Sequence, residues 1–166
     1  MFEYQNKLQY PVKIKNPNPN YAKIIISQLG GPDGELAAST RYLSQRFTMP
    51  YSRIIGILTD VGVEELSHVE MVSAILYQLT RNLTVEEIKK SGFDTYFVDH
   101  TSGIYPVAAS GVPFRADYIG VKGDVFADLN EDLAADAAIL CTVDSVYLCI
   151  LLAKYTNNIH NFFRQF

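Results

Sequence analysis

The stretch that decides the fold is residues 59–71, which read TDVGVEELSHVEM. Apolar residues flank and enter it at steps of three and four, at Leu58, Val61, Val72, Ile75 and Leu79. This spacing is typical of a helix with one buried face, and it predicts a long helix from about residue 51 to residue 81. The same rhythm, continued through the middle of the stretch, reaches Glu65 and His68.

A glutamate and a histidine on a buried helix face need a physical reason to be there. An ionised carboxylate buried without a partner costs several kcal/mol, so it is normally paired, hydrogen-bonded or bound to a cation. Side chains three residues apart are neighbours on a helix, so Glu65 and His68 can bind the same metal ion. Alternatively, the two side chains simply hydrogen-bond to each other or to a facing residue. The pair alone leaves both interpretations open.

A second candidate ligand, Glu35, comes from an earlier helix. Residues 30–34, GGPDG, break or kink a helix expected over residues 21–29, and the helix resumes at Glu35 and runs to about residue 47. Tyr42 lies two turns after Glu35 on the same side, where its phenol can hydrogen-bond a ligating carboxylate. Alternatively, Glu35 is a charge that stabilises the positive end of the helix dipole.

A third helix supplies one more inward carboxylate. We expect it to begin near Asp124 and to continue past residue 150, with a face formed by Leu129, Leu133, Asp136, Leu140, Val143, Tyr147 and Ile150. Asp136 is the single carboxylate on this face. Three helices then each aim a carboxylate at one interior that also holds an imidazole. Such a donor set suits manganese or non-haem iron better than structural zinc.

The rest of the chain organises these helices into one domain over residues 1–166. Residues 1–20 form an extended arm rich in proline and asparagine, Thr84 is predicted to cap a short helix, and residues 82–123 form a long crossover. This order predicts an all-α, ferritin-like four-helix bundle with a long crossover. Because only three long helices are visible, we expect the fourth to be missing or replaced by the C-terminal tail, residues 138–166.

Composition argues against two classes of partner. The 166 residues carry a net charge of −4 and no basic cluster, so no nucleic-acid partner is expected. The apolar run over residues 134–153 is interrupted by Asp136 and Asp144, which favours a core helix over a membrane span. The first residues show no apolar signal segment, and the two cysteines are expected to be buried thiols, so we expect a cytoplasmic protein.

Several motifs resemble those of the manganese catalase family. They are GGPDGELAA at residues 30–38, followed by RYL at 41–43, the whole of residues 59–71, and VDH at 98–100 with GVPF at 111–114 in the crossover. The opening KLQYPV at residues 7–12 is most similar to the branch of the family called spore coat protein JC. The likeness covers about residues 1–136.

The resemblance implies a site and a reaction. Glu35 would be a terminal ligand, Glu65 would bridge two manganese ions, and His68 would bind one of them through nitrogen; iron is an alternative metal. The implied reaction is the disproportionation of hydrogen peroxide to water and dioxygen, with two-electron steps at the metal pair and nearby carboxylates that carry protons. Family enzymes assemble through their crossovers, so we expect a homo-oligomer. The JC branch adds other spore coat proteins as partners and the spore coat as a second location.

Two departures bear on the activity. Asp136 stands where the family has a glutamate, so this ligand is one methylene shorter. After about residue 137 the chain no longer resembles the family, whose fourth helix carries a second Glu-x-x-His motif. The only late histidine, His160, comes too early, follows asparagine where the family has glutamate, and falls off the Asp136 face. The alternative function is therefore a spore-coat structural or assembly protein with an incomplete metal site. A diiron oxidase or ferroxidase is less favoured, because those proteins usually show two Glu-x-x-His motifs.

Overall fold

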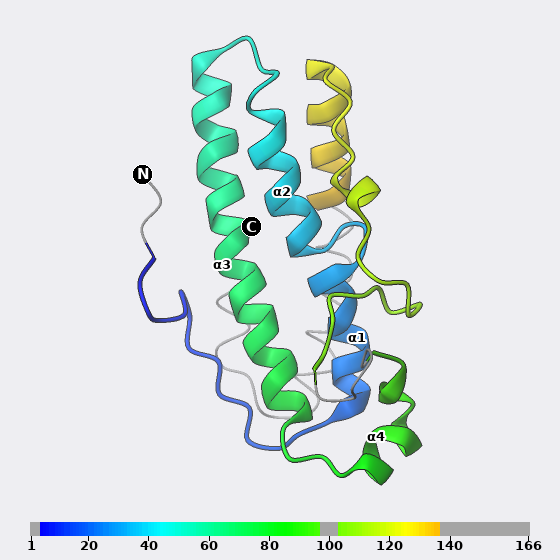
Figure 1. Ribbon diagram of the computed structural model, residues 1–166. Helices are drawn as coiled ribbons and strands as arrows, with labels where there is room; N and C mark the ends of the chain where they lie inside the picture. Colours follow the sequence, from blue (N-terminus) through cyan, green and yellow to red (C-terminus); the bar gives the residue numbers. More distant parts are fainter. Residues whose placement is uncertain (1–3, 97–102, 137–166) are drawn as a thin grey trace.

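The structure is a computed structural model that describes residues 4–96 and 103–136. Its helices in chain order are α1 (Pro19–Gly30), α2 (Glu35–Gln45), α3 (Ser52–Thr80), α4 (Val85–Ser91) and the 3-10 helices η1 (Phe93–Tyr96) and η2 (Ala116–Ile119), and a further helical segment covers residues 125–136. The described residues contain no strand, only an isolated antiparallel bridge between Val107 and Pro113. The architecture is all-α, as predicted (Figure 1).

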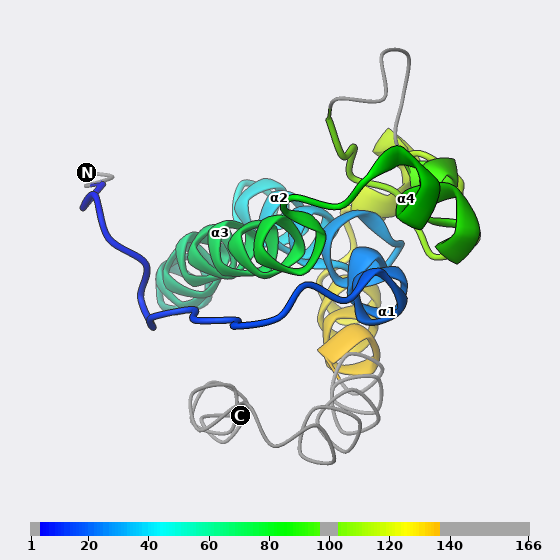
Figure 2. The ribbon, with the colours of Figure 1, turned by 90° about the horizontal axis from the view of Figure 1, so that it is seen from below.

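Three lines of helix form the frame around the candidate site. α2 packs along the first half of α3, and α1 packs along its second half (Figure 1). Figure 2 looks along the helices and shows α3 on one side of α1 and α2 and helical residues 125–136 on another. Because α1 and α2 follow each other along α3, they act as one broken helix whose break lies beside the middle of α3.

Glycine determines where this helix breaks. The N–H of Gly31 donates to the carbonyl of Ser27 at 2.8 Å and ends α1. At Gly30 the crossover comes so close that an added Cβ would lie 2.2 Å from the backbone nitrogen of Val107, so only glycine fits there. The turn that follows makes Glu35 the first residue of α2 and brings its side chain to α3, within 3.6 Å of His68.

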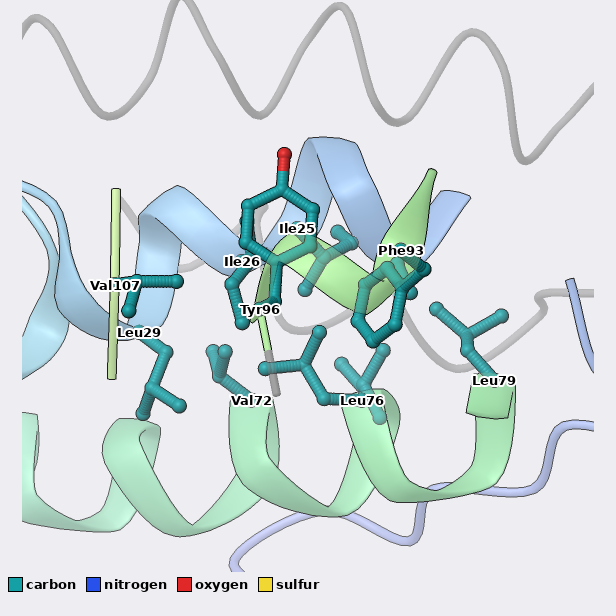
Figure 3. Packing of buried hydrophobic residues seen from close by; sticks show 11 residues of the cluster. Ile25, Ile26, Leu29, Val72, Leu76, Leu79, Phe93, Tyr96 and Val107 are labelled. Carbon is teal, nitrogen blue, oxygen red and sulfur yellow. The ribbon is translucent and has the colours of Figure 1, made fainter. Parts of the chain in front are cut away.

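Two apolar clusters hold the frame together. The larger joins α1 to the second half of α3, and Figure 3 shows its members Ile25, Ile26, Leu29, Val72, Leu76, Leu79, Phe93, Tyr96 and Val107. The smaller joins α2 to the first half of α3 and includes Ala38, Tyr42, Met49 and Leu58, with Val61, Val125 and Leu129 packed against it. Burial of such side chains stabilises the fold by roughly 1.5–3 kcal/mol each. On α3 the candidate site lies between the two clusters.

Hydrogen bonds attach the crossover to the helices. Thr84 caps α4, because its Oγ1 accepts the N–H of Glu87 at 3.2 Å and the Glu87 carboxylate accepts the N–H of Thr84 at 2.8 Å. Arg41 of α2 is buried and donates to the carbonyls of Tyr118 and Ile119, each at 3.0 Å. The two bonds of Arg41 hold η2 against α2.

The arm follows α3 without regular structure as far as residue 18. The Gln78 carboxamide accepts the N–H of Ile14 at 2.7 Å and donates to the carbonyl of Val12 at 2.8 Å. Asn18 then caps α1 by accepting the N–H of Asn20 at 3.0 Å. The arm is therefore slightly shorter than the predicted residues 1–20, because Pro19 already belongs to α1.

The helices predicted on either side of the candidate site are confirmed, with ends shifted by one or two residues. The inward face predicted for helical residues 125–136 is wrong in part: Leu133 is 70% exposed and Asp136 is exposed as well, whereas Asp128 and Asp132 are buried. Asp132 faces α2, where Gln45 donates a hydrogen bond to it, and Leu133 is left outside. The predicted continuation past residue 136 and the tail lie outside the described residues. Within the described ranges, no helix combines the length and hydropathy needed to cross a membrane.

Candidate metal centre

Three of the predicted site residues meet inside the bundle. Glu35, Glu65 and His68 are only 4%, 7% and 3% exposed. Nδ1 of His68 lies 2.7 Å from Oε2 of Glu65 and 3.6 Å from Oε2 of Glu35. One ligand atom from each residue lies within 4.8 Å of the others, a spacing that fits ligands around one cation.

The two helices that carry these residues are closely packed at this level. Glu65 and His68 are one turn apart on α3 and point to the same side, as their spacing predicts. A Cβ added at Gly62 would lie 2.8 Å from Cγ of Leu43 on α2, so the missing side chain lets α2 approach α3 just before Glu65. This approach places Glu35, the first residue of α2, within reach of His68.

Burial and close contact shift the pKa of each member of the centre. Burial raises the pKa of Glu35 to about 8, although its hydrogen bond with His68 acts in the opposite direction. Burial disfavours the charged form of His68, but its hydrogen bonds to Glu35 and Glu65 outweigh burial and raise the pKa to about 10. Burial likewise opposes ionisation of Glu65, but the hydrogen bonds from His68 and Glu35 outweigh burial and lower the pKa of Glu65. In the metal-free centre, protons bound to Glu35 and His68 therefore balance the negative charge of the carboxylates.

A divalent cation can replace those protons. Two carboxylates exceed the charge that one imidazolium balances, and metal binding deprotonates its ligands. An oxygen-rich donor set with one imidazole suits manganese or iron. The sequence left two alternatives to a metal site. The first, a hydrogen bond between Glu65 and His68, is present at 2.7 Å. Glu35 is indeed in the first turn of α2, but a solvated dipole charge would be exposed and Glu35 is buried.

Asp136 lies near the centre without joining the group of three. Its Oδ1 accepts the phenol O–H of Tyr42 at 2.7 Å. Burial and the negative charge of Glu65 raise the pKa of Asp136, while the Tyr42 hydrogen bond lowers it. Burial and the Asp136 carboxylate also raise the pKa of the Tyr42 phenol well above its usual range. Tyr42 therefore bonds the carboxylate of Asp136, and both its role beside the metal ligands and the ligand role of Asp136 stay predictions. His160 lies outside the described residues.

Sequence reasoning missed two buried aspartates on the helical segment that carries Asp136. Asp128 accepts the backbone N–H groups of Lys122 at 2.7 Å and Gly123 at 3.1 Å. Asp132 accepts a hydrogen bond from Nε2 of Gln45 at 3.0 Å, and burial raises its pKa to about 6. The signal was present, because residues 128, 132 and 136 recur every fourth position and so share one helix face. A search for apolar residues alone selected Leu133 instead.

Comparisons with known proteins support this reading of the chain. A family model described as manganese containing catalase matches residues 1–148. Protein CotJC of Bacillus subtilis is 50% identical over 136 residues, which cover 82% of this chain and 71% of CotJC. A probable manganese catalase of Clostridium acetobutylicum is 36% identical over 140 residues, which cover 82% of this chain and 61% of the relative.

A comparison with a solved structure supports the same family assignment. Wild-type KatB, a manganese catalase from Anabaena, matches with a TM-score of 0.78 and 31% identity, over 88% of this chain and 65% of the KatB chain. The chain thus spans less than two thirds of the length of both the Clostridium and the Anabaena protein. The helical fold is ferritin-like, as predicted. By sequence and by structure, the chain belongs to the manganese catalase family.

Proposed function

We propose that the chain binds two manganese ions and disproportionates hydrogen peroxide to water and dioxygen. The convergence of Glu35, Glu65 and His68 in a buried group is the observation that carries this proposal. Glu65, which lies on α3 one turn from its hydrogen-bond partner His68, is the carboxylate proposed to bridge the ions. Membership in the family supports manganese as the metal, and iron is the alternative.

The protein's own residues have separable tasks in this proposal. Glu35 and Glu65 offer carboxylate oxygens, and His68 offers Nδ1, which faces both of them. Bound manganese would supply the redox chemistry, by exchanging electrons with peroxide in pairs. Asp136, held by the phenol of Tyr42, is proposed as a further ligand or as a carrier of protons between the centre and solvent.

Metal loading with an oxygen-evolution assay tests the activity. The purified chain is loaded with manganese, and in parallel with iron, and dioxygen release is recorded after addition of hydrogen peroxide. We expect about two manganese ions per chain and sustained oxygen release. Glu65→Gln should remove most of this release, whereas the matched control Glu64→Gln, at the neighbouring and less buried position, should retain it. Turnover that is equal in both variants contradicts the proposal.

A spore-coat assembly protein is the second candidate function. It is supported by the 50% identity with CotJC. The matched region covers 71% of CotJC, compared with 61% of the probable manganese catalase of Clostridium acetobutylicum. In this candidate function the chain forms a homo-oligomer that associates with other coat proteins, and the metal site is incomplete. It predicts that Glu65→Ala still assembles and that the wild type shows little peroxide turnover. Loss of the oligomer in that variant, measured by light scattering, would count against it.

A further inference from the structure

Gln45 of α2 and Asp132 of the neighbouring helical segment form a buried pair in which only half of the polar atoms are satisfied. Gln45 is 0% exposed and Asp132 is 6% exposed. Nε2 of Gln45 donates to Oδ1 of Asp132 at 3.0 Å. In the described part of the chain, Oε1 of Gln45 and Oδ2 of Asp132 are buried and have no hydrogen-bond partner. Both atoms are acceptors when the carboxylate is ionised, so neither can satisfy the other.

One proton on Asp132 removes both deficits. A protonated Oδ2 is a donor, and Oε1 of Gln45 is an acceptor on the side chain that already bonds Oδ1. In that state the acid would donate from Oδ2 to Oε1, beside the existing bond from Nε2 to Oδ1, which gives two antiparallel hydrogen bonds. We propose that Asp132 is a neutral carboxylic acid at neutral pH, and that its two-point bond with Gln45 fixes the register of helical residues 125–136 on α2.

The charged groups around Asp132 are consistent with this state. Burial is the largest influence and raises the pKa of Asp132. The N–H of Gln45 and the guanidinium of Arg41, both on α2, lower it, while Asp136 and Asp128 on its own helix raise it. A second hydrogen bond to Gln45 can form only with the acid, so it favours the protonated form of Asp132 in the same direction as burial.

The register matters because it determines where Asp136 lies. Asp136 is one turn beyond Asp132 and meets Tyr42, which is one turn before Gln45 on α2. Asp132 is thus a positioning residue for Asp136, a consequence that rests on the proposed function. The protonation of Asp132 does not rest on it, and it is tested on the metal-free full chain.

Asp132→Asn tests the pair, because the amide supplies an N–H in place of the acid O–H and keeps both hydrogen bonds. We expect its chemical unfolding midpoint at neutral pH to equal or exceed that of the wild type, with an advantage that grows at alkaline pH. Asp128→Asn is the matched control. Both carboxylate oxygens of Asp128 accept backbone N–H groups, so an amide nitrogen there faces a donor and the midpoint should fall.

Infrared spectroscopy measures the proton directly and needs no variant to fold. Carbon-13 labelling of the aspartate carboxyl groups distinguishes them from Glu35. We expect the labelled wild type to show the C=O stretch of a protonated aspartic acid at neutral pH, and Asp132→Asn to lack it. Absence of the band from the wild type overturns the proposal, as does a fall of the Asp132→Asn midpoint as large as that of Asp128→Asn. Failure of manganese binding alters neither readout.

Discussion

Nδ1 of His68 faces Oε2 of Glu65 at 2.7 Å across one turn of α3, and both side chains are buried between two apolar clusters. A buried charged pair contributes little to stability by itself, since loss of hydration offsets the attraction between the charges. Glu35 adds a second carboxylate 3.6 Å from the same nitrogen. Because two carboxylates face one imidazole, the centre favours binding of a cation.

The stability of the metal-free chain should fall as pH rises from weakly acidic to alkaline. Glu35 has its pKa raised from 4.5 to about 8 and His68 from 6.5 to about 10, so between these limits the folded chain holds more protons than the unfolded chain. Unfolding free energy decreases with pH wherever the folded state binds more protons. Thermal unfolding in the presence of a chelator measures the effect.

Glu35→Gln is the control for this dependence, because glutamine is neutral at every pH. It should remove the part of the slope that lies between pH 4.5 and about 8. Manganese should act in the opposite direction, raising the unfolding temperature more at higher pH because its ligands must be deprotonated. A metal-free wild type that gains stability between weakly acidic and alkaline pH contradicts this description of the centre.

Tyr42→Phe should weaken the attachment of helical residues 125–136 to α2. The substitution removes the phenol that donates to Asp136 at 2.7 Å and leaves the packing of the ring in place. We expect a loss of about 1 kcal/mol in unfolding free energy, measured with urea. Tyr77→Phe, at a position 68% exposed, is the control and should change stability little. Equal losses in the two variants would show that the hydrogen bond is without consequence.

Two glycines of α3 should respond in opposite ways to alanine. At Gly62 a Cβ would lie 2.8 Å from Cγ of Leu43, so Gly62→Ala should separate α2 from α3 and cost about 1–3 kcal/mol. At Gly56 nothing lies within 4 Å of the added atom, so Gly56→Ala should stabilise the helix by about 0.5–1 kcal/mol. Urea unfolding of both variants measures the difference. A neutral Gly62→Ala would mean that the two helices are less closely packed than described.

Much of the fold followed from local patterns. The positions of α3 and of its two buried polar residues followed from apolar spacing, because one face of that helix is buried from Leu58 to Leu79. The break before Glu35 followed from the glycines and the proline that interrupt the helix. That the three side chains meet was an inference from polar residues on buried faces, since burial without partners is costly.

The parts that failed depend on contacts between segments distant in the sequence. Leu133 was placed inside by its apolar character, whereas the structure buries Asp132 because Gln45 donates to it across 87 residues. No residue near Asp132 in the sequence indicates that Gln45 is its hydrogen-bond partner. Likewise, the role of Gly62 becomes visible only when Leu43 of α2 lies against it. Local periodicity gives the buried face of a helix well where most of that face is apolar, as on α3, and less well where several polar residues occupy it.

Titration of the chain with manganese(II) tests the central claim most directly. Binding to the wild type, Glu65→Gln, His68→Gln and Glu64→Gln is followed by calorimetry and by the loss of the free-ion signal in electron paramagnetic resonance. We predict saturable binding to the wild type and to Glu64→Gln, and affinity reduced about 100-fold or more in the Glu65 and His68 variants. Affinities that are the same in all four proteins, or a wild type that binds no manganese, would contradict the claim that Glu35, Glu65 and His68 form a metal centre.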